Sequence, residues 1–170
     1  VTPYYNKTSQ PGLIAHYTAV ADAVQAPIIF YNVPGRTGLN VLPATMAELV
    51  RHSNIAGIKE ASGNIEQIVT LAALCPDLPI YAGNDDHVVP MLAIGAQGVI
   101  STIANVIPRD MHDMCQAFFD GNTATARQLQ IKVQPVWKAA FGDVNPIPVK
   151  TMLQLMGMCT GELRLPLVPP

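Results

Sequence analysis

The chain alternates between short apolar segments and longer segments whose apolar residues recur at helical spacing. Four short segments, residues 27–33, 55–59, 78–83 and 98–103, are continuously apolar rather than alternating, which is typical of parallel strands buried on both faces. Helix-like segments precede, separate and follow them, so strands and helices alternate along the chain. Regular repeats of this kind predict an α/β fold with a parallel sheet and helical crossovers.

Residues suited to helix ends support this division. Residues 13–24 and 65–75 place their apolar side chains at the spacing of one helix face. We expect first-turn prolines at Pro43 and Pro108, N-caps at Asn64 and Asp86, and C-terminal stops at Gly95 and Gly121.

Two architectures fit the repeats: an open doubly wound sheet, or part of a (β/α)8 TIM barrel. No GxGxxG motif follows a strand and no P-loop occurs, which disfavours a nucleotide-binding open sheet. A complete barrel takes about 250 residues. We therefore predict the C-terminal half of a barrel, about strands five to eight, at residues 1–121, with residues 1–5 as a strand tail.

Residues 122–170 are predicted to form an incomplete C-terminal helical extension. Its two helical segments are residues 123–141 and 146–156, and Pro135 should kink the first of them. Because half a barrel exposes strand edges and an open core, we expect these 170 residues to be part of a longer protein and to be neither stable nor active alone.

Composition excludes several functional classes. The chain is 49% hydrophobic and 13% charged with a net charge of −2, so it has a large core and no basic surface for nucleic acid or for anionic lipid. Its apolar runs are too short to span a bilayer. Cys75, Cys115 and Cys159 form no CxxC motif and are odd in number, which is typical of reduced thiols in a cytoplasmic protein.

The predicted strand ends carry reactive side chains, and barrel enzymes place their active sites at such ends. Lys59 ends one apolar run, where loss of hydration should lower its pKa and leave an amine able to form a Schiff base with a carbonyl compound. Tyr5 and Tyr31 could move protons, and Arg36 could grip a carboxylate. Each residue alone has a structural explanation, but their convergence favours a site.

Another strand end carries Asp85, Asp86 and His87, which could suggest a metal site. We favour the simpler interpretation, acidic residues stabilised at a helix N-terminus, and predict no metal.

Five motifs carry a resemblance to a known family: VTPYYNK at residues 1–7, YNVPGRTG at 31–38, GIKEASGN at 57–64, GVIS at 98–101 and NPIPVK at 145–150. On these motifs essentially the whole chain resembles the dihydrodipicolinate synthases, within the pyruvate-dependent class I aldolases and lyases. YNVP followed by an arginine is the specific part, because the related sialic acid lyases lack that arginine.

The resemblance implies a lyase that condenses pyruvate with L-aspartate-4-semialdehyde to 4-hydroxy-tetrahydrodipicolinate, on the route to lysine and diaminopimelate. It implies that no metal or organic cofactor is needed and that the enzyme is a homotetramer of tight dimers. The implied roles are a Schiff-base lysine at Lys59, a proton shuttle at Tyr31, a relay tyrosine reaching the neighbouring subunit at Tyr5, a carboxylate grip at Arg36, and a pyruvate pocket lined by Gly83 and the Ile100 backbone.

The chain departs from the family pattern at Thr8, where a proline is usual, and it lacks the threonine pair of the family's strand-one region, one member of which links the two relay tyrosines. Two alternatives stay open. One is a pyruvate-dependent aldolase with a different aldehyde partner, and the other is a non-catalytic barrel that only binds ligand or serves a structural role.

Overall fold

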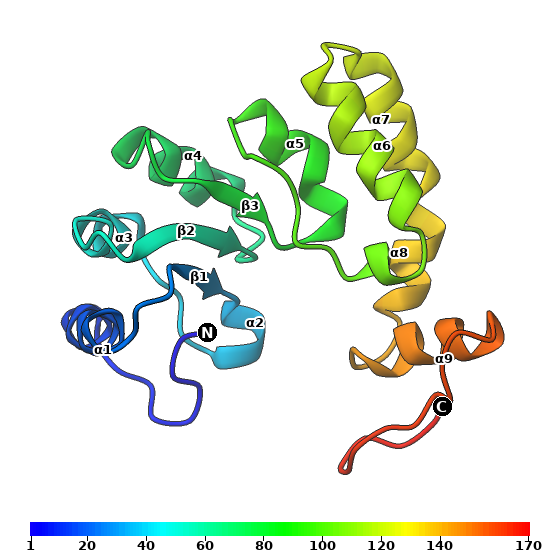
Figure 1. Ribbon diagram of the computed structural model, residues 1–170, viewed down its shortest axis with the longest axis horizontal. Helices are drawn as coiled ribbons and strands as arrows, with labels where there is room; N and C mark the ends of the chain where they lie inside the picture. The colour runs from blue at the N-terminus through cyan, green and yellow to red at the C-terminus, as the bar shows by residue number, and fades with distance from the viewer. The chain divides into compact units, whose positions relative to one another are not determined.

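The computed structural model describes residues 1–170, which divide into two compact units, Val1–Ile100 and Ser101–Pro170 (Figure 1). The first unit holds every residue of the predicted site and is built on a parallel sheet. The second unit is helical. Each unit is described by itself.

The sheet of the first unit has three parallel strands in the order β1 (Ile28–Asn32), β2 (Ile55–Glu60) and β3 (Ile80–Ala82). Strands that follow one another in the chain are neighbours in the sheet, as the predicted repeats require. The register places Tyr31 opposite Lys59 and Asn32 opposite Glu60. The C-terminal ends of β1 and β2 therefore meet at one edge of the sheet.

The helices of this unit are α1 (Gln10–Ala23), α2 (Pro34–Thr37), α3 (Pro43–Leu49), α4 (Ile65–Leu74) and α5 (Val88–Ala93), with a 3₁₀ turn η1 (Asp85–His87) before α5. Helices α1, α3 and α4 lie in a row along one side of the sheet, with α3 in contact with both others (Figure 1). The core lies between these helices and the strands. Its fully buried side chains are Leu13, Phe30, Met46, Leu49, Ile58 and Ile68.

The side chains on the two faces of β1 and β2 differ in burial within this chain. Phe30 and Ile58, on the helix side, are each 1% exposed, whereas Ile29 on the other face is 49% exposed and Tyr31 and Lys59 are partly exposed. Successive side chains of a strand point to opposite faces, and within this unit helices cover only one face. We call the uncovered face, which carries Ile29, Tyr31 and Lys59, the open face.

The predicted fourth strand, residues 98–103, is reduced to one bridge between Val99 and Ala82. The segment does run beside β3, because the Ile100 amide donates to the Ala82 carbonyl at 2.9 Å. However, β3 has only three residues, which is too short to support a longer ladder, and Ile103 begins another 3₁₀ turn, η2 (Ile103–Asn105). The prediction of a strand at 98–103 was therefore wrong in extent.

The N-terminal residues 1–5 form no strand either. Side-chain hydrogen bonds anchor them instead: the buried Thr2 hydroxyl donates to the Leu39 carbonyl at 3.2 Å, and the Tyr17 hydroxyl donates to the Val1 carbonyl. Pro3 has no N–H to offer to a neighbouring strand.

Most predicted helix ends are confirmed. Pro43 and Pro108 lie in first turns, and the Asn64 side chain accepts the Gln67 amide at 3.1 Å as an N-cap. Gly95 and Gly121 follow α5 and α6 (Pro108–Phe119) with positive φ angles of 104° and 80°. The N-cap predicted at Asp86 was wrong, because Asp86 lies inside η1 and His87 precedes α5.

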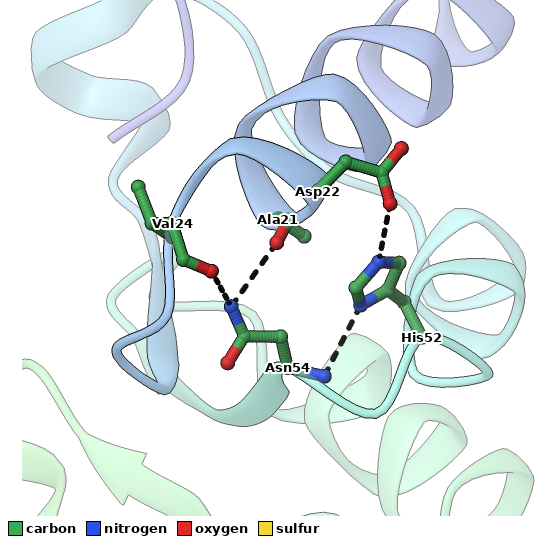
Figure 2. A network of polar contacts seen from close by, with 5 residues as sticks. All are labelled: Ala21, Asp22, Val24, His52 and Asn54. Atoms are coloured by element: carbon green, nitrogen blue, oxygen red, sulfur yellow. Dashed lines mark hydrogen bonds and ion pairs between the residues drawn. The ribbon is translucent and has the colours of Figure 1, made fainter.

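An anchor at the end of α1 fixes the start of the sheet (Figure 2). The Asn54 side chain donates to the carbonyls of Ala21 at 3.1 Å and Val24 at 2.8 Å, which satisfies the end of the helix. The Asn54 backbone amide donates to His52 Nδ1, and His52 Nε2 lies 3.0 Å from an Asp22 carboxyl oxygen. His52, for which the sequence suggested no role, thus ties α1 to the loop before β2.

The second unit contains η2, α6 (Pro108–Phe119), α7 (Thr123–Lys132), α8 (Gln134–Ala140) and α9 (Ile147–Leu155). Helices α6 and α7 pack side by side (Figure 1). The kink predicted at Pro135 is a complete break, because proline lacks an N–H for the helix interior but suits the first turn of α8. None of the helices is both long enough and apolar enough to cross a membrane.

Candidate active site

Lys59 and Tyr31 form the centre of the candidate site. They are paired directly across β2 and β1, and both lie on the open face of the sheet. The Lys59 Nζ lies 4.2 Å from the centroid of the Tyr31 ring. An ammonium group at this distance is attracted to the face of the ring, which holds the two side chains together.

The surroundings shift the pKa values of both groups. Burial lowers the pKa of Lys59 below its usual 10.5, and the positive charge of Arg36 lowers it further, while the negative charge of Asp85 raises it. Burial also raises the pKa of Tyr31, and Arg36 partly offsets that rise. The lysine is thus easier to deprotonate, while the tyrosine keeps a proton that it can donate. This pairing suits a nucleophilic amine beside a proton shuttle.

Arg36 stands on α2, a single helical turn that follows β1 directly. The local sequence builds this turn: Pro34 begins it, and Gly38 ends it in the left-handed conformation (φ 67°), with its amide donating to the Pro34 carbonyl at 2.8 Å. Arg36 is exposed and forms no ion pair with another residue of the chain. Its guanidinium is therefore available to a carboxylate.

Gly83 lies where β3 ends beside β2, and its amide donates to the Glu60 carbonyl at 2.8 Å. A Cβ at this position would lie 2.7 Å from the Ala61 Cβ and 2.9 Å from the Glu60 oxygen, so only glycine allows this approach. The Ile100 amide donates its hydrogen bond to the Ala82 carbonyl, and Ile100 is 38% exposed.

The predicted site residues are therefore only partly assembled. Lys59 and Tyr31 come together, the charge of Arg36 acts on both, and the Gly83 backbone lies one strand away. Tyr5 does not join them: it lies in the N-terminal loop and is 88% exposed, so its ring makes almost no contact within this chain.

Asp85 is a member of the site that the sequence analysis missed. It was interpreted only as an acidic residue at a helix start, but it is fully buried and its charge acts on Lys59. The available signal was its place: it is the first acidic residue after β3, the strand next to that of Lys59. No group of three or more His, Cys, Asp or Glu side chains is arranged to hold a metal ion.

Comparison with known proteins gives one answer. Residues 1–170 match the model of the Dihydrodipicolinate synthetase family. The chain is 56% identical over 167 residues to a 4-hydroxy-tetrahydrodipicolinate synthase of Caldicellulosiruptor bescii, covering 98% of this chain and 57% of the relative.

Solved structures agree with this match. The dihydrodipicolinate synthase of Thermotoga maritima is 45% identical with a TM-score of 0.96, covering 99% of this chain and 59% of that one. The enzyme of Acinetobacter baumannii, complexed with pyruvate, is 40% identical with a TM-score of 0.94, covering 99% and 58%. The chain thus spans less than two thirds of the length of these relatives, and its α/β structure with a parallel sheet fits part of a TIM-barrel enzyme. On its sequence and its fold, the chain belongs to the dihydrodipicolinate synthetase family.

Proposed function

We propose that the protein carrying this chain condenses pyruvate with L-aspartate-4-semialdehyde to give 4-hydroxy-tetrahydrodipicolinate, in the cytoplasmic biosynthesis of lysine and diaminopimelate. The observation that carries the proposal is the Lys59–Tyr31 pair, an amine of lowered pKa placed 4.2 Å from the ring of a tyrosine that retains its proton. The names of its relatives support the choice of substrates.

In this proposal the neutral Lys59 amine attacks the keto carbon of pyruvate and the carbonyl oxygen leaves as water, giving an iminium. The iminium draws electrons from the neighbouring methyl group, which can then lose a proton and attack the aldehyde carbon. The amino group of the aldehyde substrate then attacks the iminium carbon, and ring closure breaks the bond to Lys59 and releases its amine. Tyr31 moves the protons, and Arg36 holds the carboxylate of the aldehyde substrate. Gly83 and the Ile100 backbone line the pyruvate pocket. The lysine supplies the covalent chemistry, so the scheme needs no metal or organic cofactor.

We further propose that residues 1–121 are the C-terminal half of a (β/α)8 barrel and that residues 122–170 begin a helical extension. The open face supports this, because Ile29 is 49% exposed there on a strand whose other face is covered. The 57% coverage of a full-length relative supports it as well. The complete enzyme would be a homotetramer of tight dimers, and Tyr5, 88% exposed, would extend into the neighbouring subunit's site.

Borohydride trapping tests the proposal on the polypeptide expressed from the complete gene. Incubation with pyruvate and borohydride should add one reduced pyruvyl group, and peptide mapping should place it on Lys59. Lys59→Arg is the matched control and should gain none, because a guanidinium does not form the imine. A wild-type protein without an adduct would overturn the proposed chemistry. Turnover of a different aldehyde, but not of aspartate semialdehyde, would overturn the proposed substrate.

A further inference from the structure

Two buried polar residues lie directly behind the candidate site, on the helix-covered face of the sheet. Asn32 follows Tyr31 on β1, and Glu60 follows Lys59 on β2; they are 0% and 1% exposed. Because neighbouring residues of a strand point to opposite faces, these two side chains point away from the open face, where Lys59 and Tyr31 stand. Neither has a role in the proposed reaction.

Glu60 is bound by hydrogen-bond donors and by no cation. Its Oε2 accepts the Asn32 Nδ2 at 2.9 Å, and its Oε1 accepts the Ser62 amide at 2.6 Å. Both oxygens act as acceptors in these hydrogen bonds. A buried carboxyl group is costly unless such hydrogen bonds compensate for lost hydration. The position of the Glu60 side chain therefore depends on its hydrogen bond from Asn32.

The Asn32 side chain uses both its amide nitrogen and its amide oxygen. Besides Glu60, its Nδ2 donates to the Asn40 Oδ1 at 2.9 Å, and its Oδ1 accepts the Val41 amide at 3.1 Å. The Asn40 side chain in turn exchanges two hydrogen bonds with Gln67 of α4. One amide thus joins β2 to the loop that follows α2, the turn that carries Arg36.

This connection acts on the register of the two strands. Asn32 and Glu60 are opposite one another, and so are Tyr31 and Lys59 one residue earlier. A slip of one residue would move each side chain to the other face of the sheet, so a bond between Asn32 and Glu60 also fixes Tyr31 against Lys59. The hydrogen bond from the Val41 amide to Asn32 holds the loop after α2, the turn that carries Arg36, to β1 in the same way.

We propose that Asn32 and Glu60 are positioning residues for the Schiff-base lysine: their buried hydrogen bond holds Lys59 against Tyr31 and aligns the Arg36 turn with both. This inference rests on the proposed function for its chemical consequence, but the positioning itself concerns only this chain's residues.

The polarity of the hydrogen bond suggests a decisive set of variants. Glu60→Gln keeps the shape but places an amide N–H₂ against a donor, either Asn32 Nδ2 or the Ser62 amide. Asn32→Asp keeps the shape but sets two carboxyl groups against each other. The double variant, N32D with E60Q, reverses the bond. The amide introduced on β2 can donate to the carboxylate introduced on β1, whose second oxygen still accepts the Val41 amide. The Asn40 and Gln67 amides can flip together to keep their hydrogen bonds to each other, at the loss of the 3.3 Å hydrogen bond from Gln67 Nε2 to the Val41 carbonyl.

The test measures the rate of borohydride-trapped imine formation with pyruvate, using each polypeptide expressed from the complete gene. Each single variant should lose about tenfold or more in rate, because small misplacements of a reacting group are costly, and the double variant should regain most of it. Thr45→Val is the control: it removes the hydrogen bond from the buried Thr45 hydroxyl to the Gln10 Oε1 at 2.6 Å, which is partly buried, and should lower the melting temperature without changing the trapping rate.

Full activity in both single variants would overturn the inference, as would a double variant no faster than the singles or an equal loss in Thr45→Val. A second measurement needs no substrate: the pH dependence of Lys59 acetylation by acetic anhydride, followed by peptide mass. The single variants should shift this profile and the double variant should restore it. If the wild type forms no adduct, the proposed function fails, and an unshifted acetylation profile would separately refute the positioning.

Discussion

The close approach of β3 to β2 at Gly83 gives a quantitative prediction for Gly83→Ala. The added Cβ would lie 2.7 Å from the Ala61 Cβ and 2.9 Å from the Glu60 carbonyl oxygen, both closer than such atoms normally approach. The backbone oxygen cannot rotate away as a flexible side chain could. The ends of β2 and β3 must therefore separate, which lengthens the 2.8 Å bond from the Gly83 amide to Glu60.

Two costs add. Forcing a methyl group into a close-packed site costs about 1–3 kcal/mol. Weakening the hydrogen bond costs about 1 kcal/mol more. The expected loss is then about 2–4 kcal/mol, seen as a lower melting temperature of the polypeptide expressed from the complete gene. The displaced β2 end should also slow imine formation at Lys59, because it carries the proposed nucleophile.

Thermal unfolding followed by circular dichroism measures this loss, with Gly35→Ala as the matched control. A Cβ at Gly35 meets no atom within 4 Å, and an alanine in the α2 turn should leave stability unchanged or raise it by about 0.4–1 kcal/mol. Adding Ala61→Gly to Gly83→Ala removes the nearer clash and should recover part of the loss. Equal melting temperatures for Gly83→Ala and the wild type would refute the reasoning.

Three further predictions concern charge and helix ends. Arg36→Met should raise the pKa of Lys59 and move the pH profile of imine trapping to higher pH, whereas Asp85→Asn should move it to lower pH; shifts in the same direction would contradict the electrostatic assignment. Lys59→Met should be more stable than the wild type at neutral pH. The pKa of Lys59 in the folded state lies below its unfolded value of 10.5, because burial disfavours the charged form. The buried charge therefore destabilises the wild type fully below the folded-state pKa, and this cost disappears as pH rises past 10.5. The melting temperatures of Lys59→Met and the wild type should converge across this pH range. Asn54→Ala leaves two carbonyls at the end of α1 without their donor and should cost about 1–3 kcal/mol in urea denaturation; an unchanged midpoint would mean that water replaces the cap.

The sequence predicted best where local chemistry decides the structure. Pro43 and Asn64 mark helix starts because a missing N–H or a side-chain acceptor suits the first turn whatever the rest of the fold does. The N-cap predicted at Asp86 was wrong because a 3₁₀ turn, rather than an α-helix, follows Asn84, and Asp86 is the second residue of that turn. The strand at 98–103 failed because its extent depends on its neighbour, the short β3.

The candidate site was predicted in part for a similar reason. That Lys59 and Tyr31 share one edge follows from parallel strands, but their direct pairing depends on the register, which no local pattern fixes. Asn32 and Glu60 stand beside them in the quoted motifs, yet their importance appears only when burial and hydrogen-bond partners are known. Asp85 acts on Lys59 from the end of another strand, so its charge could be assigned only in three dimensions.

The open face connects the two main results. The strands are apolar enough for burial on both faces, yet only the helix side is covered, and Lys59 and Tyr31 stand on the other. Burial is already the largest cause of both pKa shifts. The second half-barrel of the proposed complete enzyme would remove more water from this face, which lowers the pKa of the lysine and raises that of the tyrosine further. Completion of the barrel would therefore strengthen the same electrostatic arrangement, while the Asn32–Glu60 bond, buried on the helix side, is already complete within this chain.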